Sequence, residues 1–104
     1  MKQFRLTRQA LTDLSGIENH ISQHSPAAAL RVLDQLMATF QLLADNPGIG
    51  TAVDDIQRGL RYFTAGGAAS RYVVLFRRAV DGVAITDVFH AAQDWQGMIT
   101  RGDR

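Results

Sequence analysis

The sequence has no cysteine and only two prolines among its 104 residues. The absence of cysteine excludes disulfide bonds and thiolate metal ligands. No uncharged apolar run approaches the ~20 residues that a membrane-spanning helix requires, so we expect no membrane partner. The opening residues also lack the hydrophobic stretch of a secretory signal. We therefore expect a cytoplasmic protein with a single domain over residues 1–104, since this length is typical of one domain.

Common signatures of catalysis are missing as well. The sequence has no GxSxG motif, no phosphate-binding GxxxxGK loop and no dinucleotide-binding GxGxxG after a strand. His20 and His24 lie four residues apart, near Glu18, but without the HExxH pattern of a zinc site. Asp54 and Asp55 are adjacent, so their side chains point apart. We expect no metal site and no cofactor, and we interpret these residues as polar groups at a helix end and in a loop.

The basic residues are unevenly placed, and nearly all of them are arginine. The formal net charge is only +1, yet seven of the eleven Lys and Arg residues fall in residues 58–104, together with four of the ten acidic residues. The guanidinium group suits planar pairing with carboxylate or phosphate better than lysine does. Two interpretations stay open, an ordinary solvated sheet face or a surface on which an acidic partner docks.

Hydrophobic spacing predicts a short strand and two helices in the first half. Residues 4–6 alternate as a strand does, and Thr7 is a good N-cap for a helix over residues 8–22. Ser25 followed by Pro26 predicts the start of a second helix, which we expect to end near Ala44, before Asn46-Pro47-Gly48. The expected apolar stripes, at steps of three and four, are Leu11, Leu14, Ile17 and Ile21 in the first helix and Leu30, Leu33, Leu36 or Met37, Phe40 and Leu43 in the second.

The second half changes to a period of two, which is typical of strands. Residues 48–59 are interpreted as an irregular loop, and the tail after residue 90 as weakly ordered with a short helical turn near 94–99. Short turns, including Asp81-Gly82, favour an antiparallel meander of three strands, at 60–63, 71–78 and 83–90. The predicted fold class is α+β, with order β-α-α-β-β-β and a small antiparallel sheet. The helical hairpin should cover one face and leave the other free to be solvated.

Two groups of residues remain as candidates for function. The meander carries a set of arginines, and its last strand ends at His90, next to Asp94 and Trp95, which we expect to be exposed. The alternative for His90 and Asp94 is that they only cap and tether the tail. The candidates for contact with another macromolecule are Arg61, Arg71, Arg77, Arg78, His90, Asp94 and Trp95.

The order of motifs along nearly the whole chain resembles the RelE/ParE superfamily of type II toxin–antitoxin toxins. Each fragment is short, and the resemblance depends on the ordered set. The matching motifs are "A..DL..I" from Ala10 to Ile17, "L...P..G" in residues 42–50, Gly59-Leu60-Arg61, the strands at 72–77 and 83–85, and Val88-Phe89-His90 with Asp94.

The resemblance implies one of two activities. RelE-like members cleave mRNA at the ribosome with a basic and aromatic cluster, whereas ParE-like members inhibit DNA gyrase, arrest growth and stabilise plasmids. The sequence departs from the nuclease pattern, because its only lysine is Lys2 and residues 91–93, Ala-Ala-Gln, stand where such nucleases have Arg and then Tyr. We therefore expect the gyrase-inhibiting branch, without a catalytic residue. In the nuclease alternative, phosphate binding and proton transfer would fall to Arg61, Arg71, Arg77 and His90.

The resemblance also implies a partner. A cognate antitoxin would form a hetero-oligomer with the toxin, placing a helix in an apolar groove and adding a strand to the sheet, with its acidic side chains on the arginines. Direct contact with nucleic acid is expected only in the nuclease alternative. A third alternative is a family member that is no longer toxic and only binds antitoxin.

Overall fold

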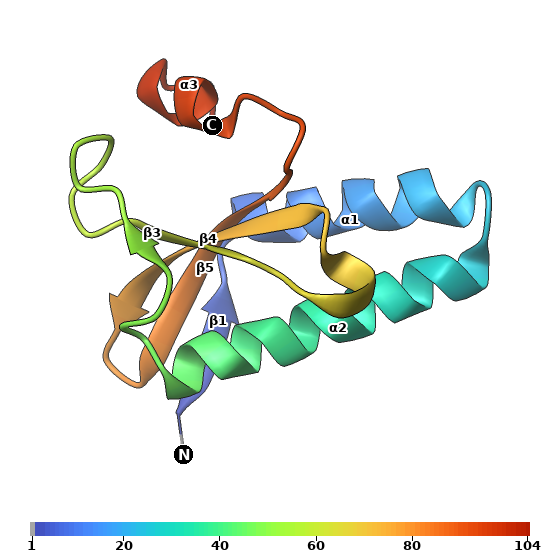
Figure 1. Ribbon diagram of the computed structural model, residues 1–104, viewed down its shortest axis with the longest axis horizontal. Helices are drawn as coiled ribbons and strands as arrows, with labels where there is room; N and C mark the ends of the chain where they lie inside the picture. The colour runs from blue at the N-terminus through green and yellow to red at the C-terminus, as the bar shows by residue number, and fades with distance from the viewer. Residues whose placement is uncertain (1) are drawn as a thin grey trace.

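A layer of two long helices packs on a twisted sheet in the computed structural model, which describes residues 2–104 (Figure 1). The chain enters through one strand, turns back through the helical hairpin, and ends in a meander followed by a short helix. The elements are β1 (Gln3–Leu6), α1 (Arg8–Ser22), α2 (Pro26–Asp45), β2 (Thr51–Ala52), β3 (Arg61–Thr64), the 3-10 turn η1 (Gly67–Ala69), β4 (Tyr72–Ala79), β5 (Gly82–His90) and α3 (Trp95–Thr100).

The capping residues place the helix boundaries where the sequence predicts them. The hydroxyl of Thr7 accepts the N–H of Ala10 at 3.2 Å, and the hydroxyl of Ser25 accepts the N–H of Ala28 at 3.1 Å. Each hydroxyl satisfies one of the N–H groups that the first turn of a helix leaves without a partner. Helix α2 ends at Asp45, one residue beyond the prediction. Within residues 2–104, every helix is too short or too polar to cross a bilayer.

The sheet is mixed, with strand order β1-β5-β4-β3-β2. Strands β3, β4 and β5 form the predicted antiparallel meander. The prediction of a wholly antiparallel sheet is wrong, because β1 pairs in parallel with β5, Phe4 opposite Val83. A parallel pair needs a long crossover connection, and the helices together with the rest of the meander supply it here. The predicted irregular loop at 48–59 also contains β2, which pairs with β3.

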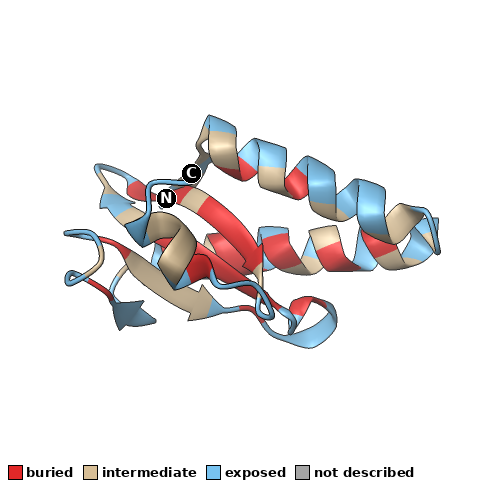
Figure 2. Ribbon diagram, turned by 90° about the horizontal axis from the view of Figure 1, so that it is seen from above, coloured by how far each residue is buried: buried red, intermediate tan, exposed pale blue. Residues whose placement is uncertain are grey.

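The main core lies between the helical hairpin and one face of the sheet (Figure 2). Leu36, Phe40 and Leu43 of α2 are fully buried there against residues of β4 and β5. Part of the predicted stripes is wrong, since Leu11, Leu30 and Met37 are exposed. The buried line of α2 instead includes smaller residues that each lie next to a residue of the predicted stripe, namely Ala29, Val32, Thr39 and Ala44. Their small side chains let the helix approach the sheet closely.

The second face of the sheet is covered, contrary to the prediction that it would be solvated. The loop between β2 and β3 and helix α3 fold onto it, and α3 lies away from α2 in Figure 1. This second core consists of Val53, Leu60, Val73, Leu75, Phe89 and Trp95. Because β4 and β5 therefore lie between two apolar layers, their sequences are nearly continuous hydrophobic runs rather than strict alternations.

Gly82 begins β5 where β1 pairs with it. Its φ is +147°, and a Cβ at this position would lie 1.9 Å from the carbonyl oxygen of Gln3. That oxygen belongs to the parallel partner strand, so it cannot move aside without disturbing the pairing. We expect Gly82→Ala to lower the free energy of unfolding by about 1–3 kcal/mol in urea denaturation.

Gly16 provides the control for this substitution. It lies inside α1, and a Cβ there would have no atom within 4 Å. Gly16→Ala should therefore raise the free energy of unfolding by about 0.5–1 kcal/mol, because alanine favours the helix. A Gly82→Ala protein as stable as the parent would contradict the close approach of β1 to β5.

Candidate functional site

Arg61, at the start of β3, holds the segment that leads from α2 into β2. Its Nε donates to the carbonyl oxygen of Ile49 at 3.1 Å, and Nη2 donates to those of Gly48 and Gly50 at 2.7 and 3.1 Å. Hydrogen bonds from a charged donor are stronger than those between neutral groups. Arg61 therefore fixes this segment, and only the two N–H groups of its Nη1 remain for a partner.

Arg77, on β4, holds the next loop along the chain. Its two terminal nitrogens donate to the carbonyl oxygen of Arg58 and to the side-chain oxygen of Gln57. Within the same loop, the Asp54 carboxylate accepts the N–H of Gly59 at 2.8 Å. The loop between β2 and β3 is thus tied both to itself and to the sheet.

Arg61, Arg77 and Arg78, the edge arginine cluster, line one hollow of about 320 Å³ beside β2, together with Asp54. None of the ion pairs formed within residues 2–104 involves these three arginines. Three cations therefore share this hollow with one carboxylate, and its net charge is positive. Such a surface attracts acidic groups of another molecule.

Arg71 and His90 lie at the opposite end of the same strands. Tyr72 pairs with His90 in the register of β4 and β5, and their rings meet edge to face with centroids 5.5 Å apart. The Nδ1 of His90 accepts the N–H of Ala92 at 3.0 Å, and the N–H of His90 donates to the side chain of Gln93 at 2.9 Å. His90 thus tethers the start of the tail through these contacts.

The structure therefore divides the predicted nuclease residues into two groups. Arg71 directly precedes β4 and Arg77 lies on it, six residues further along extended chain, which corresponds to about 20 Å at ~3.3 Å per strand residue. Arg61 lies near the Arg77 end, and His90 near the Arg71 end. Groups that act on one phosphate must approach it within roughly 3–3.5 Å, so these four residues do not converge on a single phosphodiester.

Asp94 and Trp95 have structural contacts at the start of α3. The Asp94 carboxylate caps this helix by accepting the N–H of Gly97 at 3.1 Å. The expectation of an exposed tryptophan is wrong, because Trp95 is buried in the second core, its ring centroid 5.1 Å from that of Tyr62. An aromatic residue in a short amphipathic turn packs on the apolar sheet face beneath it.

Sequence reasoning missed a buried ionic cluster formed by Arg104, Asp13 and Asp87. Arg104 donates to the Asp87 carboxylate through Nε at 3.3 Å and to that of Asp13 through Nη2, and its guanidinium carbon lies 4.2 Å from the centre of the Phe89 ring. The side chains of Arg104, Asp13 and Asp87 are only 16%, 9% and 8% exposed. The available signal was an aspartate, Asp87, within an otherwise apolar strand, since buried carboxylates require a partner.

Burial raises the pKa of the Asp87 carboxyl above its ordinary value of 3.8. A hydrogen bond from the Thr86 hydroxyl and the charge of Arg104 lower this pKa, whereas the negative charge of Asp13 raises it. Loss of hydration therefore outweighs the ion pair at this site. The cluster joins α1 to β5 directly, because Asp13 also accepts the N–H of Val88 at 2.9 Å.

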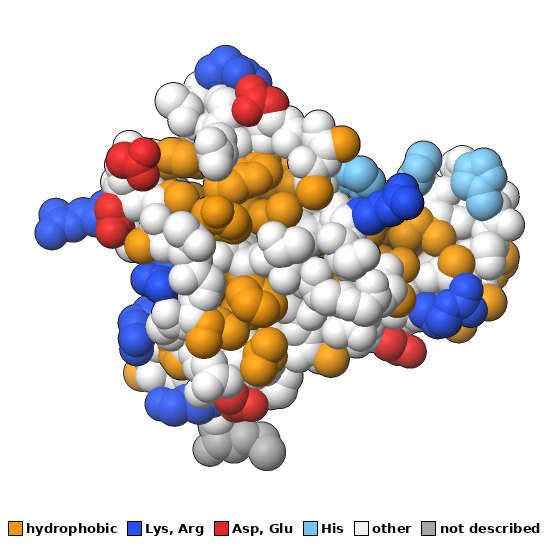
Figure 3. Space-filling model, in the orientation of Figure 1, with side chains coloured by type: hydrophobic (Ala, Val, Ile, Leu, Met, Phe, Trp, Pro, Cys, Tyr) orange, Lys and Arg blue, Asp and Glu red, His pale blue; other side chains and the backbone are white. Residues whose placement is uncertain are grey.

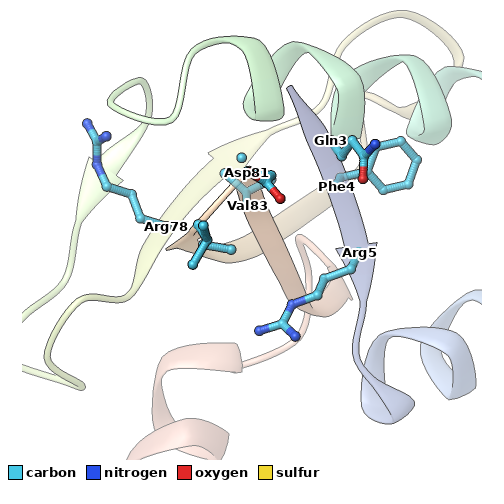
Figure 4. A pocket seen from close by; sticks show the side chains of 9 residues that line it. Gln3, Phe4, Arg5, Arg78, Asp81 and Val83 are labelled. Carbon is cyan, nitrogen blue, oxygen red and sulfur yellow. The ribbon is translucent and has the colours of Figure 1, made fainter. Parts of the chain in front are cut away.

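A hollow of about 480 Å³ lies at the turn between β4 and β5, beside β1. Figure 4 shows that the side chains of Arg5 and Arg78 extend in different directions from its rim, with Asp81 between their strands. Because the two guanidinium groups stay apart and a carboxylate lies between them, this hollow does not form a concerted anion site.

Within residues 2–104, no three histidine or acidic side chains gather as a metal site would require. The rings of His20 and His24 meet edge to face at the end of α1, with centroids 6.2 Å apart. Both remain at a helix end, on the side of the molecule away from the edge arginine cluster.

Comparison with known proteins places the chain in a family. Residues 4–95 match the model of the ParE toxin of the type II toxin–antitoxin system parDE. Toxin ParE1 of Caulobacter vibrioides is 30% identical over 95 residues, a match that covers 90% of this chain and 94% of that protein. A solved chain from a chromosomal ParDE system of P. aeruginosa has the same fold, with a TM-score of 0.70 at 22% identity over 86% of this chain and 96% of its own. The chain belongs to the ParE toxin family of type II toxin–antitoxin systems.

Proposed function

We propose that this chain is a toxin that arrests growth by binding DNA gyrase, and that a cognate antitoxin neutralises it by binding the same protein. Membership of the ParE family supports this proposal. The observation that carries it is the edge arginine cluster, because none of the ion pairs within residues 2–104 involves its three arginines. Loop carbonyls hold Arg61 and Arg77 in place, so this charge is presented in a fixed arrangement that suits contact with a protein surface.

The sheet edge and the outer face of α2 offer contact surfaces for the antitoxin. Strand β2 pairs with β3 at Arg61 and Tyr62, and within residues 2–104 the remaining β3 residues, Phe63 and Thr64, have no strand partner on that side. On α2, Leu30 and Met37 are exposed and lie seven residues apart, hence on one line along the helix. An added strand at this edge and an apolar helix on α2 would cover both surfaces.

The separation of the predicted nuclease residues favours gyrase binding over mRNA cleavage. Arg71 and His90 lie at one end of β4 and β5, and Arg61 and Arg77 at the other. Stabilising the transition state of phosphodiester cleavage requires cations and a proton-transfer group around the same phosphate. The arrangement fits contacts spread over a protein partner better than such a centre.

The proposal is tested by adding the purified protein to gyrase and measuring DNA supercoiling. The parent protein should inhibit supercoiling, and Arg78→Glu should weaken inhibition by about tenfold, because it reverses one charge of the edge arginine cluster. Within residues 2–104, none of the ion pairs involves the Arg78 side chain, which is exposed, so the substitution should leave the fold intact. Arg31→Glu is the matched control, since Arg31 is an exposed arginine on α2 and should leave inhibition unchanged.

Unaffected gyrase at a large excess of folded protein would overturn the proposal. Cleavage of mRNA in translating ribosomes that is lost in His90→Ala would support the mRNA interferase instead. Growth that continues when the folded protein is expressed alone, together with binding to the antitoxin, would identify a member that has lost its toxicity.

A further inference from the structure

A separate hollow of about 290 Å³ lies where the second half of α1 meets the ends of β4 and β5. It is distinct from the edge arginine cluster and shares no residue with it. Its polar lining consists of His20, Ser70, Arg71, Tyr72 and His90, and no aspartate or glutamate lines it. Figure 3 shows the histidines along this side of the molecule, with a basic side chain beside them. The remaining lining residues, Ile21, Val32 and Ala68, are apolar, so every polar side chain of this hollow is a potential donor.

The hydrogen bonds of His90 determine which of its nitrogens can serve a ligand. Its Nδ1 accepts the N–H of Ala92 at 3.0 Å, so the neutral imidazole carries its proton on Nε2. This Nε2–H is a donor without the ring being charged. Arg71 contributes a permanent cation, and none of the ion pairs within residues 2–104 involves it.

His20 lines the hollow from the last turn of α1. The charged and titratable groups around it are His24 on its own helix, Arg71, Tyr72 and His90 of the sheet, and, in an adjoining hollow that shares His20, Asp13 with Arg104. Arg104 binds the carboxylates of Asp13 and Asp87, which limits their effect on His20.

We propose that this hollow binds the phosphate group of a small ligand. Donors converge on it from a helix and from two strands, and a tetrahedral oxyanion has acceptor oxygens on several sides, whereas a carboxylate has two oxygens in one plane. The bound group is then either free phosphate or the exposed end of a phosphate monoester.

The test is an NMR titration of the histidine side chains of the intact chain at constant ionic strength. The probes are inorganic phosphate, adenosine monophosphate, acetate and sulfate. We expect His20 and His90 to show saturable shifts with phosphate and with sulfate. Equal affinity for phosphate and adenosine monophosphate would indicate free phosphate as the ligand, and tighter binding of the nucleotide would indicate a monoester.

Variants separate the site from a general effect of charge. Arg71→Gln should weaken sulfate binding by about tenfold, and His20→Gln should also weaken it, because both side chains line the hollow. His24→Gln is the matched control, because His24 lies next to His20 but does not line the hollow. Shifts that do not saturate, acetate binding as tight as that of phosphate, or equal weakening by His24→Gln would overturn the proposal. Amide spectra of each variant establish that the fold is retained.

Discussion

Replacing Phe40 by alanine is expected to lower the free energy of unfolding by about 3–5 kcal/mol. Phe40 is 0% exposed and lies in α2 at the centre of the main core. Its ring contacts that of Phe4 on β1, with centroids 5.5 Å apart and planes inclined at 60°. The substitution therefore removes apolar contacts to both the helix layer and the edge strand, and leaves a cavity that close-packed neighbours fill only in part.

Chemical denaturation followed by circular dichroism measures this loss. Leu30→Ala is the matched control on the same helix, because Leu30 is 64% exposed, and a change within about 0.5 kcal/mol is expected. Since a loss of this size is a large part of the stability of a small domain, Phe40→Leu serves as a milder variant with an expected cost below about 1.5 kcal/mol. If Phe40→Ala left the free energy of unfolding nearly unchanged, the helices would not pack on the sheet as described.

Removing the guanidinium of Arg104 is expected to cost about 3–5 kcal/mol, because it leaves two buried carboxylates without their cation. The side chains of Asp13 and Asp87 are largely buried, and Arg104 is the cation paired with both. Thermal or urea unfolding of Arg104→Ala measures the effect. Arg101→Ala is the control, because the Arg101 side chain is 56% exposed and its pairs with Asp94 and Asp103 lie in solvent, where ion pairs contribute little to stability.

A second substitution distinguishes lost charge pairing from lost packing. In the Arg104→Ala background, Asp87→Asn removes one of the two uncompensated negative charges and should restore part of the stability. If the loss came only from the contact of Arg104 with the Phe89 ring, Asp87→Asn would restore nothing. That result would overturn the electrostatic explanation.

The raised pKa of Asp87 also predicts how stability changes with pH. A carboxyl whose pKa is higher in the folded state binds its proton more tightly there than in the unfolded chain. Its contribution to stability is fully present below the unfolded pKa and is lost as the pH rises through the folded pKa. The stability of the parent relative to Asp87→Asn should therefore fall from about pH 3 towards neutral pH. A difference that grew with rising pH would mean that Arg104 lowers the pKa of Asp87 by more than burial raises it.

The capping and spacing signals of the sequence predicted the helices and the meander correctly, because they depend on neighbours in the chain. The hydroxyls of Thr7 and Ser25 mark helix starts through contacts three residues away. The same local reasoning failed where contacts are distant in sequence. It missed the parallel pairing of β1 with β5 and the pairing of β2 with β3, and it placed Trp95 in solvent.

The candidate site shows the same division. The sequence alone shows that residues 58–104 are rich in arginine and that the ordered motifs resemble the RelE/ParE superfamily. Comparison with known proteins confirmed the family. The sequence could not show which arginines share a surface, because Arg71 directly precedes β4 and Arg77 lies in the second half of that strand, far from Arg71.

By itself, the sequence determined the fold class, the helical hairpin, the antiparallel meander and the family, since periodicity, caps and motif order are properties of the chain. Only the tertiary structure decided the mixed sheet, the second core, the pairing of Arg104 with Asp13 and Asp87, and the hollow that brings His20 to Arg71 and His90. These features join residues up to 91 positions apart. Such contacts depend on how whole elements pack, and local sequence preferences do not encode them.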